Sequence, residues 1–235
     1  MRDIKWTLAE RASQVRMNSM STKPLYVRVV ALGDSLTVGF QSYGLFGSEE
    51  ALTPYTEFLA ERIRKEFRQG ILSVQIINKG VIGELSEQML IRFDADVVEL
   101  SPAVVIILGG SNDLGWGLTP DEVFSNLRQM YELSMKNGIV PIACTVPSIL
   151  GFDAGISSRR VLNKLIQEHS LKMGIRCVDL FRATIDPATS RLASRYSSDG
   201  LHLNSEGYRK MAEAVFEEGL RPVLRAMTDA SSSRG

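Results

Sequence analysis

Short apolar runs rich in β-branched residues recur along the chain, and most are followed by a stretch with apolar side chains at helical spacing. The runs lack the strict apolar–polar alternation of a half-exposed strand, which indicates strands buried on both faces of a parallel sheet. These predicted strands are Tyr26–Leu32, Val74–Asn78, Ala103–Leu108, Val140–Val146 and Ile175–Leu180.

The stretches between the strands predict helices, and Asp121–Lys136 carries the clearest boundary signals. Thr119 is a good N-cap, Pro120 suits the first helical position, and Glu122 completes a capping box, while Gly138 follows the end. The other predicted helices are Pro54–Phe67, Leu85–Leu100, Ser157–Met173 and Glu206–Met227. Alternating strands and helices predict a doubly wound α/β sheet with right-handed crossovers. A catalytic side chain is therefore expected directly after a strand, where the strand order reverses.

One domain is predicted over residues 25–227, because no internal repeat or long linker interrupts it. Residues 1–24 form an N-terminal extension with a loose amphipathic pattern, which suits a helix that docks on the core or on a second subunit in a homo-oligomer. Residues 228–235 are expected to be a flexible tail.

Composition and charge narrow the class of protein. The chain has 27 Lys and Arg residues and 27 Asp and Glu residues, so these charges balance. No net positive charge attracts nucleic acid, and no nucleic-acid partner is expected. No apolar run approaches the roughly 20 residues of a membrane span. The charged N-terminal stretch lacks the apolar core of a signal peptide, which predicts a cytoplasmic location. Cys144 and Cys177 lie in apolar runs and are expected to be inert core thiols; with two histidines they suggest no metal-ligand cluster.

Three predicted strands end in residues suited to chemistry. After the first, Gly33-Asp34-Ser35 can turn the Ser35 hydroxyl and backbone N–H into the crevice. After the second, Asn78–Gly83 can present the Gly83 N–H to an anion. After the third, the Asn112 amide can donate to a developing oxyanion. Each signal alone also fits a structural turn: an N-capping serine, a glycine-rich turn or an Asx turn.

Asp199 and His202 lie three residues apart, in a loop before the last helix. The carboxylate can accept from one ring nitrogen and leave the other free to take a proton from a nucleophile. Alone, the pair also fits a surface histidine beside an N-capping aspartate. His169 lies on a polar helix face and is expected to be solvated and without function. Because four strand ends supply nucleophile, backbone donor, amide donor and oriented base, the joint pattern favours a catalytic site.

These blocks closely resemble those of the SGNH hydrolases, also called the GDSL esterase/lipase family. Gly33-Asp34-Ser35-Leu36 matches the first block, Asn78–Gly83 resembles the second, Gly110–Asp113 the third and Asp199–His202 the fifth. The resemblance spans about residues 26–225. It implies a catalytic triad and an oxyanion hole made by two N–H groups and one amide. The implied triad is Ser35, Asp199 and His202, and the implied oxyanion donors are Ser35, Gly83 and Asn112.

The resemblance also implies a flavodoxin-like three-layer α/β/α sandwich with a five-stranded parallel sheet in the order 2-1-3-4-5, and no metal or organic cofactor. The chain departs from the α/β-hydrolase elbow Gly-x-Ser-x-Gly, since Thr37 stands at the second glycine position. The α/β hydrolases also carry the acid in a separate loop from the histidine, whereas here both lie in one loop.

The predicted substrate is a small-molecule ester. Phe40 and Trp116 are candidate substrate-binding residues within an apolar-aromatic lining suited to acyl, aryl or sugar groups. Further candidates, each of which also fits a packing role, are Tyr43, Leu118, Ile149 and Phe152. Because no long apolar lid segment is evident, a short-chain esterase is favoured, with carbohydrate or aryl acetyl esters as candidates. An acyltransferase or a lysophospholipase-type lipase could use the same site, whereas a non-catalytic binding module would be expected to lack one of its key residues.

Overall fold

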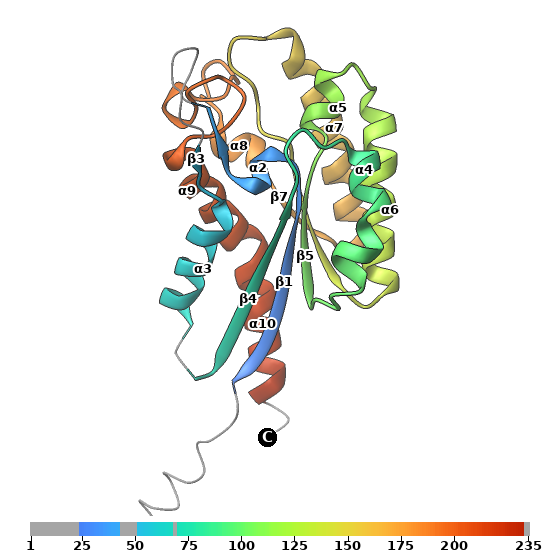
Figure 1. Ribbon diagram of the computed structural model, residues 1–235, viewed down its shortest axis with the longest axis vertical. Helices are drawn as coiled ribbons and strands as arrows, with labels where there is room; N and C mark the ends of the chain where they lie inside the picture. Colours follow the sequence, from blue (N-terminus) through green and yellow to red (C-terminus); the bar gives the residue numbers. More distant parts are fainter. Residues whose placement is uncertain (1–23, 43–50, 68–69, 233–235) are drawn as a thin grey trace, which may run out of the picture.

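A parallel five-stranded sheet forms the centre of the molecule. The computed structural model describes residues 24–42, 51–67 and 70–232. The sheet order is β4-β1-β5-β6-β7, which in chain order is 2-1-3-4-5 and confirms the predicted fold (Figure 1). The strands are β1 (Leu25–Gly33), β4 (Leu72–Gly80), β5 (Val104–Leu108), β6 (Val140–Cys144) and β7 (Arg176–Val178). A small antiparallel pair, β2 (Phe40–Gln41) and β3 (Ala51–Leu52), was not anticipated by the sequence pattern.

Helices cover both faces of the sheet, so three layers are visible (Figure 1). Along β1, Val27, Val29 and Ala31 face one hydrophobic core, while Val30 and Leu32 face the other. This two-sided burial explains why the strand sequences are continuously apolar. The helices on the first face are α3 (Tyr55–Glu66), α9 (Ser205–Ala214) and α10 (Arg221–Ser232). Those on the second are α4 (Ser86–Ile91), α6 (Pro120–Lys136) and α7 (Ala154–Met173).

Two predicted helices are interrupted by π-helical turns. The predicted helix Leu85–Leu100 divides into α4 and a π-helical turn over Asp94–Val98. In the second case, a π-helical turn over Val215–Leu220 separates α9 from α10. Such turns replace the i→i−4 bond by a longer one, as in the Glu99 N–H to Asp94 carbonyl bond. The predicted capping box of α6 is confirmed, since Thr119 and Glu122 bond reciprocally.

The ends of several elements differ from the prediction for local reasons. The stretch predicted as strand up to Leu180 ends at Val178, because Asp179 caps the short helix α8 (Leu180–Thr184) by accepting from the Arg182 N–H. Helix α10 continues to Ser232 and so includes most of the residues predicted as a flexible tail. Its apolar residues, including Leu224 and Met227, pack on the core and hold this end of the helix. Of the predicted N-terminal extension, residues 1–24, all but Pro24 lie outside the described residues.

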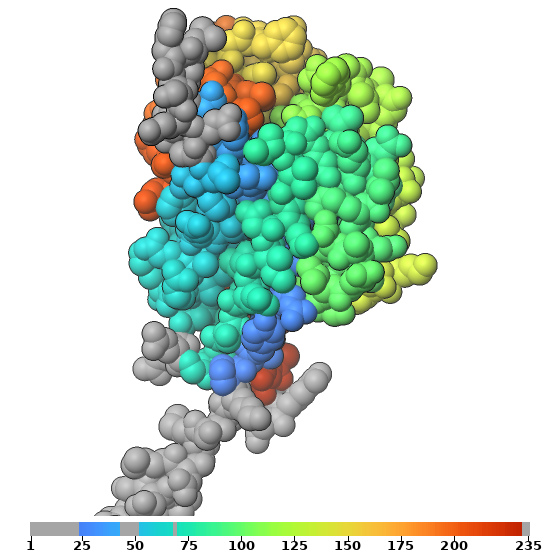
Figure 2. Space-filling model, viewed as in Figure 1, coloured from blue at the N-terminus to red at the C-terminus, as the bar shows by residue number. Residues whose placement is uncertain are grey.

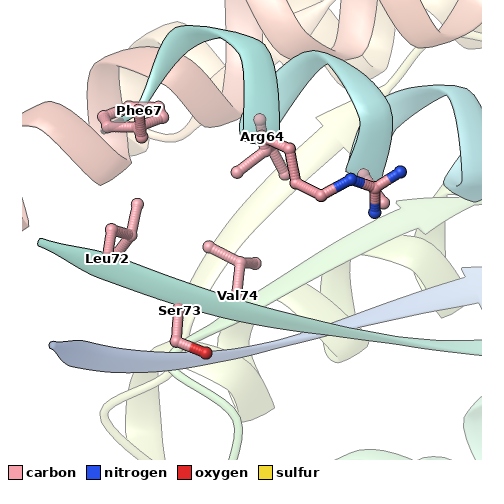
Figure 3. A pocket seen from close by; sticks show the side chains of 7 residues that line it. Arg64, Phe67, Leu72, Ser73 and Val74 are labelled. Atoms are coloured by element: carbon pink, nitrogen blue, oxygen red, sulfur yellow. The ribbon is translucent and has the colours of Figure 1, made fainter. Parts of the chain in front are cut away.

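An apolar groove of about 240 Å³ lies between α3 and the edge strand β4 (Figure 3). Leu72 and Val74 point from β4 toward α3, whereas the Ser73 side chain points away from it. These residues lie at the start of β4, and the predicted site residues follow the ends of the parallel strands. The groove therefore lies at the opposite end of the sheet from the predicted site. No helix among the described residues is long and apolar enough to cross a membrane.

Candidate active site

Ser35 is the first residue of the short helix α2 (Ser35–Val38), shortly after β1. Ser35 is only 5% exposed. Asp34 caps this helix by accepting from the Leu36 N–H at 2.9 Å, so the alternative of Ser35 as N-cap is wrong. As the first helical residue, Ser35 has a backbone N–H without an intrahelical acceptor. A side chain at Gly33 would approach the Leu108 carbonyl to 2.4 Å, so the turn needs glycine there. The tight turn after β1 thus positions both the hydroxyl and the backbone N–H of Ser35.

The end of β4 is tied to this turn by Asn78, whose amide donates to the Thr37 carbonyl at 2.7 Å. The chain then reaches Gly83, which has a φ of +76° and lies exposed, with open space around it. Within residues 24–42, 51–67 and 70–232, the Gly83 N–H has no acceptor. It can therefore donate to a ligand in the crevice.

Asn112 lies on α5 (Ser111–Gly115), directly after β5. Its amide nitrogen donates to the Glu84 carbonyl at 2.9 Å. Because an amide NH₂ has two hydrogens, this bond fixes the orientation and leaves one N–H for a ligand. The neighbouring Asp113, to which the sequence analysis gave no role, is buried and accepts from both the N–H and the hydroxyl of Ser86. This buried carboxylate anchors α4 beside α5.

The predicted contact between Asp199 and His202 is present. His202 Nδ1 lies 2.7 Å from Asp199 Oδ2, and Asp199 Oδ1 accepts from the N–H groups of Leu201 and His202 at 2.8 Å each. Burial alone would raise the pKa of Asp199, but these hydrogen bonds outweigh it and lower the pKa to about 2. Asp199 is therefore ionised at neutral pH and orients the imidazole, so that Nε2 is the free ring nitrogen.

The Asp199–His202 loop packs against the segment that follows Ser35. Phe40 meets the His202 ring edge-on, with centroids 4.7 Å apart, and Tyr208 donates to the Phe40 carbonyl at 2.7 Å. Figures 1 and 2 show this C-terminal segment (orange) beside the segment after β1 (blue). Among the residues that the structure describes, no hydrogen bond joins Ser35 to His202. Such bonds are often long in free enzymes and tighten when substrate binds.

Asp34 carries a buried carboxyl next to Ser35. Burial raises its pKa from the ordinary value of 3.8 to about 6, and the bond from Leu36 and the charge of His202 offset this only in part. Its Oδ2 atom is buried without a hydrogen-bond partner among the described residues. The carboxylate form of Asp34 therefore costs stability and interacts favourably with a protonated His202.

Replacing Asp34 by asparagine is expected to raise the free energy of unfolding at about pH 7 and to leave it nearly unchanged at about pH 4. Between these values the unfolded chain releases the Asp34 proton and the folded chain keeps it, so wild-type stability falls as the pH rises. The difference between 3.8 and about 6 corresponds to at most about 3 kcal/mol. Asparagine keeps the acceptor for Leu36. Urea unfolding of both proteins at both pH values measures the effect.

Asp153 provides the matched control for this prediction. It is exposed, and its ion pair with Arg191 lowers its pKa, the opposite direction from Asp34. Asp153→Asn is therefore expected to lower stability slightly at neutral pH. Equal stability of wild type and Asp34→Asn at both pH values would contradict the burial argument.

The predicted substrate-binding residues have different environments. Phe40 contacts His202, as described, and Trp116 is 79% exposed at the end of α5, just after Asn112. Phe152 is also exposed, whereas Leu118 is partly buried against the core, which favours its packing role. Tyr43 lies outside the described residues.

His169 is only partly exposed, less than expected for a solvated side chain. Its ring packs edge-on against Phe124 at 5.5 Å and stacks with Tyr131 at 6.2 Å, and its Nε2 is buried without a partner among the described residues. Burial lowers the pKa of His169. The cause is the packing of α6 against α7, which covers a side chain whose sequence neighbours are polar.

The two cysteines fit the expected core role. Cys144 is buried, Cys177 is half-buried, and neither forms a disulfide. Burial raises the pKa of both thiols, that of Cys177 to about 11, so neither is reactive at neutral pH. Over the described part of the chain, no three metal-ligating side chains come together.

Ser35 lies at the carboxyl edge of the parallel sheet, and the Asp199–His202 pair packs against the segment that follows it; these are residue types that a serine hydrolase needs. Residues 31–210 match the sequence model of the GDSL-like Lipase/Acylhydrolase family, and the chain belongs to this family. It is accordingly a carboxylic ester hydrolase acting on a small-molecule substrate. The match confirms the family resemblance seen in the sequence motifs.

Solved structures with the same fold include a GDSL-like lipase from Bacteroides thetaiotaomicron (24% identity, 88% of this chain and 95% of that one covered, TM-score 0.66). A lipase/acylhydrolase from Enterococcus faecalis is 25% identical, with coverage of 82% and 94% and a TM-score of 0.67. A catalytic mutant of an acetylxylan esterase from Geobacillus stearothermophilus is 19% identical, with coverage of 85% and 96% and a TM-score of 0.70. Comparison with curated proteins gives no match.

Proposed function

We propose that the protein is a serine esterase that hydrolyses short-chain carboxylic esters through an acyl-enzyme on Ser35. The observation that carries this proposal is the oriented His202 imidazole, held by Asp199 at 2.7 Å and packed against the segment that follows Ser35. The free Nε2 of His202 is the group that can accept the Ser35 proton.

In the proposed reaction, His202 Nε2 takes the hydroxyl proton of Ser35 as its Oγ attacks the ester carbonyl carbon. The tetrahedral intermediate collapses, the ester C–O bond breaks, and the leaving alcohol takes the proton from His202. Water then attacks the acyl-enzyme carbonyl while His202 Nε2 takes its proton. The second tetrahedral intermediate collapses, the bond from the acyl carbon to Ser35 Oγ breaks, and His202 returns the proton to Ser35 Oγ as the carboxylic acid leaves. Asp199 keeps its negative charge throughout and stabilises the imidazolium that forms in each half of the reaction.

The oxyanion of each intermediate needs preorganised donors. We assign this role to the Ser35 N–H, the Gly83 N–H and the second hydrogen of the Asn112 amide. The first two have no acceptor among the described residues, and the third belongs to an amide already fixed by the Glu84 carbonyl. The three donors come from the ends of β1, β4 and β5, which are neighbours in the sheet.

The proposed substrates are esters with a small acyl group, in particular acetyl esters of carbohydrates or aryl alcohols. Phe40 contacts the imidazole, so its ring lies beside the proposed base. The exposed Trp116 offers a flat face on which a sugar or aryl ring can stack. The acetylxylan esterase of the same fold acts, as its name states, on an acetylated sugar polymer.

A series of p-nitrophenyl esters from acetate to palmitate tests this proposal. We expect kcat/KM to be highest for acetate or butyrate and to fall steadily for longer chains, because the sequence has no evident long apolar lid segment to cover a long acyl chain. Pretreatment with a serine-directed fluorophosphonate should abolish turnover of every ester. A maximum at palmitate would contradict the short-chain proposal and favour a lysophospholipase-type lipase. Ester products formed with added alcohol would instead indicate an acyltransferase.

A further inference from the structure

Glu84 is linked to two of the proposed oxyanion donors, the Gly83 N–H and the Asn112 amide. It directly follows Gly83, and its backbone carbonyl accepts from the Asn112 amide at 2.9 Å. Its side chain is buried, with 6% of it exposed. Any rotation of the Glu84 backbone therefore moves the Gly83 N–H and displaces the acceptor that holds Asn112.

The Glu84 carboxylate is held by Arg92, the residue that ends α4. Arg92 Nε donates to Glu84 Oε1 at 2.6 Å, and Nη2 donates to Glu84 Oε2. This bidentate ion pair fixes the orientation of the carboxylate as well as its position. A lysine could supply the charge but not the second parallel bond.

The same guanidinium reaches the ends of the two strands that carry the site. Its Nη2 donates to the Lys79 carbonyl at 2.8 Å, and the Gly33 carbonyl lies 3.4 Å away as a weaker third partner. Gly33 precedes Asp34 and Ser35, and Lys79 is near the end of β4. Arg92 therefore joins the nucleophile turn, the β4 end and the Glu84 side chain through one rigid planar group.

The Nη1 atom of Arg92 is held by a separate ion pair with Asp96. Nη1 donates to Asp96 Oδ2 at 2.7 Å, and Lys79 Nζ donates to the other oxygen of Asp96 at 2.7 Å. The Gly83 turn is held at its start by the Val81 N–H, which donates to the Gly33 carbonyl at 2.9 Å, whereas within the turn the Glu84 N–H reaches the Val81 carbonyl only at 3.4 Å. Gly83 also has a φ of +76°, and a Cβ added to it would meet no atom within 4 Å. The Glu84 end of this turn is held by the Arg92–Glu84 contact together with the bond from the Asn112 amide.

We propose that Arg92 is a positioning residue for the oxyanion hole, acting through Glu84 on both the Gly83 N–H and the Asn112 amide. This inference rests on the proposed function, because the oxyanion hole that Arg92 would position is the one proposed above. Arg92 does not touch the reacting atoms. Its removal should therefore weaken stabilisation of the transition state more than binding of the ester.

The test compares Arg92→Met and Arg92→Lys with Lys79→Met in steady-state hydrolysis of p-nitrophenyl acetate. We expect Arg92→Met to lower kcat about 10- to 100-fold with KM changed less than about threefold, and Arg92→Lys to lower kcat about 10-fold, since loss of a whole oxyanion donor costs about 10²–10³. Lys79→Met removes an ion pair of the same network without touching Glu84. It should keep kcat within about twofold of wild type.

Inhibition by a trifluoromethyl ketone separates positioning from general loosening of the fold. Its hemiketal on Ser35 places a negative oxygen in the hole, so its affinity should fall in Arg92→Met by about the same factor as kcat. Arg92→Met should also add little to Asn112→Ala, because both changes damage the same hole. Circular dichroism establishes that each variant is folded at the assay temperature. If Arg92→Met does not fold, the single variants Glu84→Gln and Arg92→Lys are compared with the wild type in the same two measurements, kcat and inhibitor affinity.

Wild-type kcat and inhibitor affinity in the folded Arg92 or Glu84 variants would overturn the inference, as would an equal loss of kcat in Lys79→Met. Ser35→Ala is measured in parallel. Inactive Ser35→Ala with fully active Arg92 variants would refute only the positioning role. Active Ser35→Ala would instead refute the proposed function itself.

Discussion

Ser35→Ala is expected to lower kcat for ester hydrolysis by about 10⁴- to 10⁶-fold while the protein stays folded. The reason is that alanine removes the only atom that can form the acyl-enzyme, whereas the backbone N–H at this position remains in the oxyanion hole. Ser35 Oγ makes no hydrogen bond to other described residues, so its loss leaves no buried partner unsatisfied. The measurement is kcat with p-nitrophenyl acetate, together with the thermal unfolding midpoint.

Ser73→Ala is the matched control for this change. Ser73 is an exposed residue at the start of β4, at the opposite end of the sheet, beside the groove of Figure 3. It should keep wild-type turnover. If folded Ser35→Ala hydrolyses the ester at more than about a tenth of the wild-type rate, the proposed acyl-enzyme mechanism is wrong.

The second large effect is expected at His202. His202→Gln should lower kcat/KM by about 10⁴-fold or more, because the amide of glutamine cannot accept the Ser35 proton at neutral pH. The Asp199 carboxylate would keep its two backbone donors, Leu201 and His202, so the loop is expected to retain its shape. Hydrolysis of p-nitrophenyl acetate across the pH range measures the loss.

The chain provides its own control, since it has two histidines. His169 packs between Phe124 and Tyr131, away from the strand ends that carry the site. His169→Gln should lower the free energy of unfolding by about 0.5–3 kcal/mol and leave kcat/KM within about twofold of wild type. A loss of activity in His169→Gln as large as that in His202→Gln would show that the effect is not specific to the proposed base.

The order of the sheet and the location of the candidate site could be predicted because both depend on local sequence signals. Strands buried on both faces leave continuous apolar runs, as in Val104–Leu108, and parallel strands bring the residues after their ends to one edge. Asp199 and His202 are close in sequence, so their contact needs no knowledge of the fold.

Other features depend on packing between elements that are distant in sequence. His169 is flanked by polar residues, and only the packing of α6 on α7 buries its ring. The contact of Phe40 with His202 joins the two ends of the domain. Arg92 reaches Gly33 and Lys79 through a long side chain, and an arginine at the end of a helix gives no sequence signal for such a role. The π-helical turns also lack a sequence signature that separates them from an ordinary helix.

The central claim is that Ser35 is the nucleophile of this acylhydrolase, with His202 as its base. Peptide mapping by mass spectrometry after reaction with a fluorophosphonate tests it most directly. We expect one covalent adduct on Ser35 in the wild-type protein, a much slower adduct in His202→Gln, and none in Ser35→Ala. An adduct on a different serine, or equal labelling of Ser35→Ala and the wild type, would contradict it.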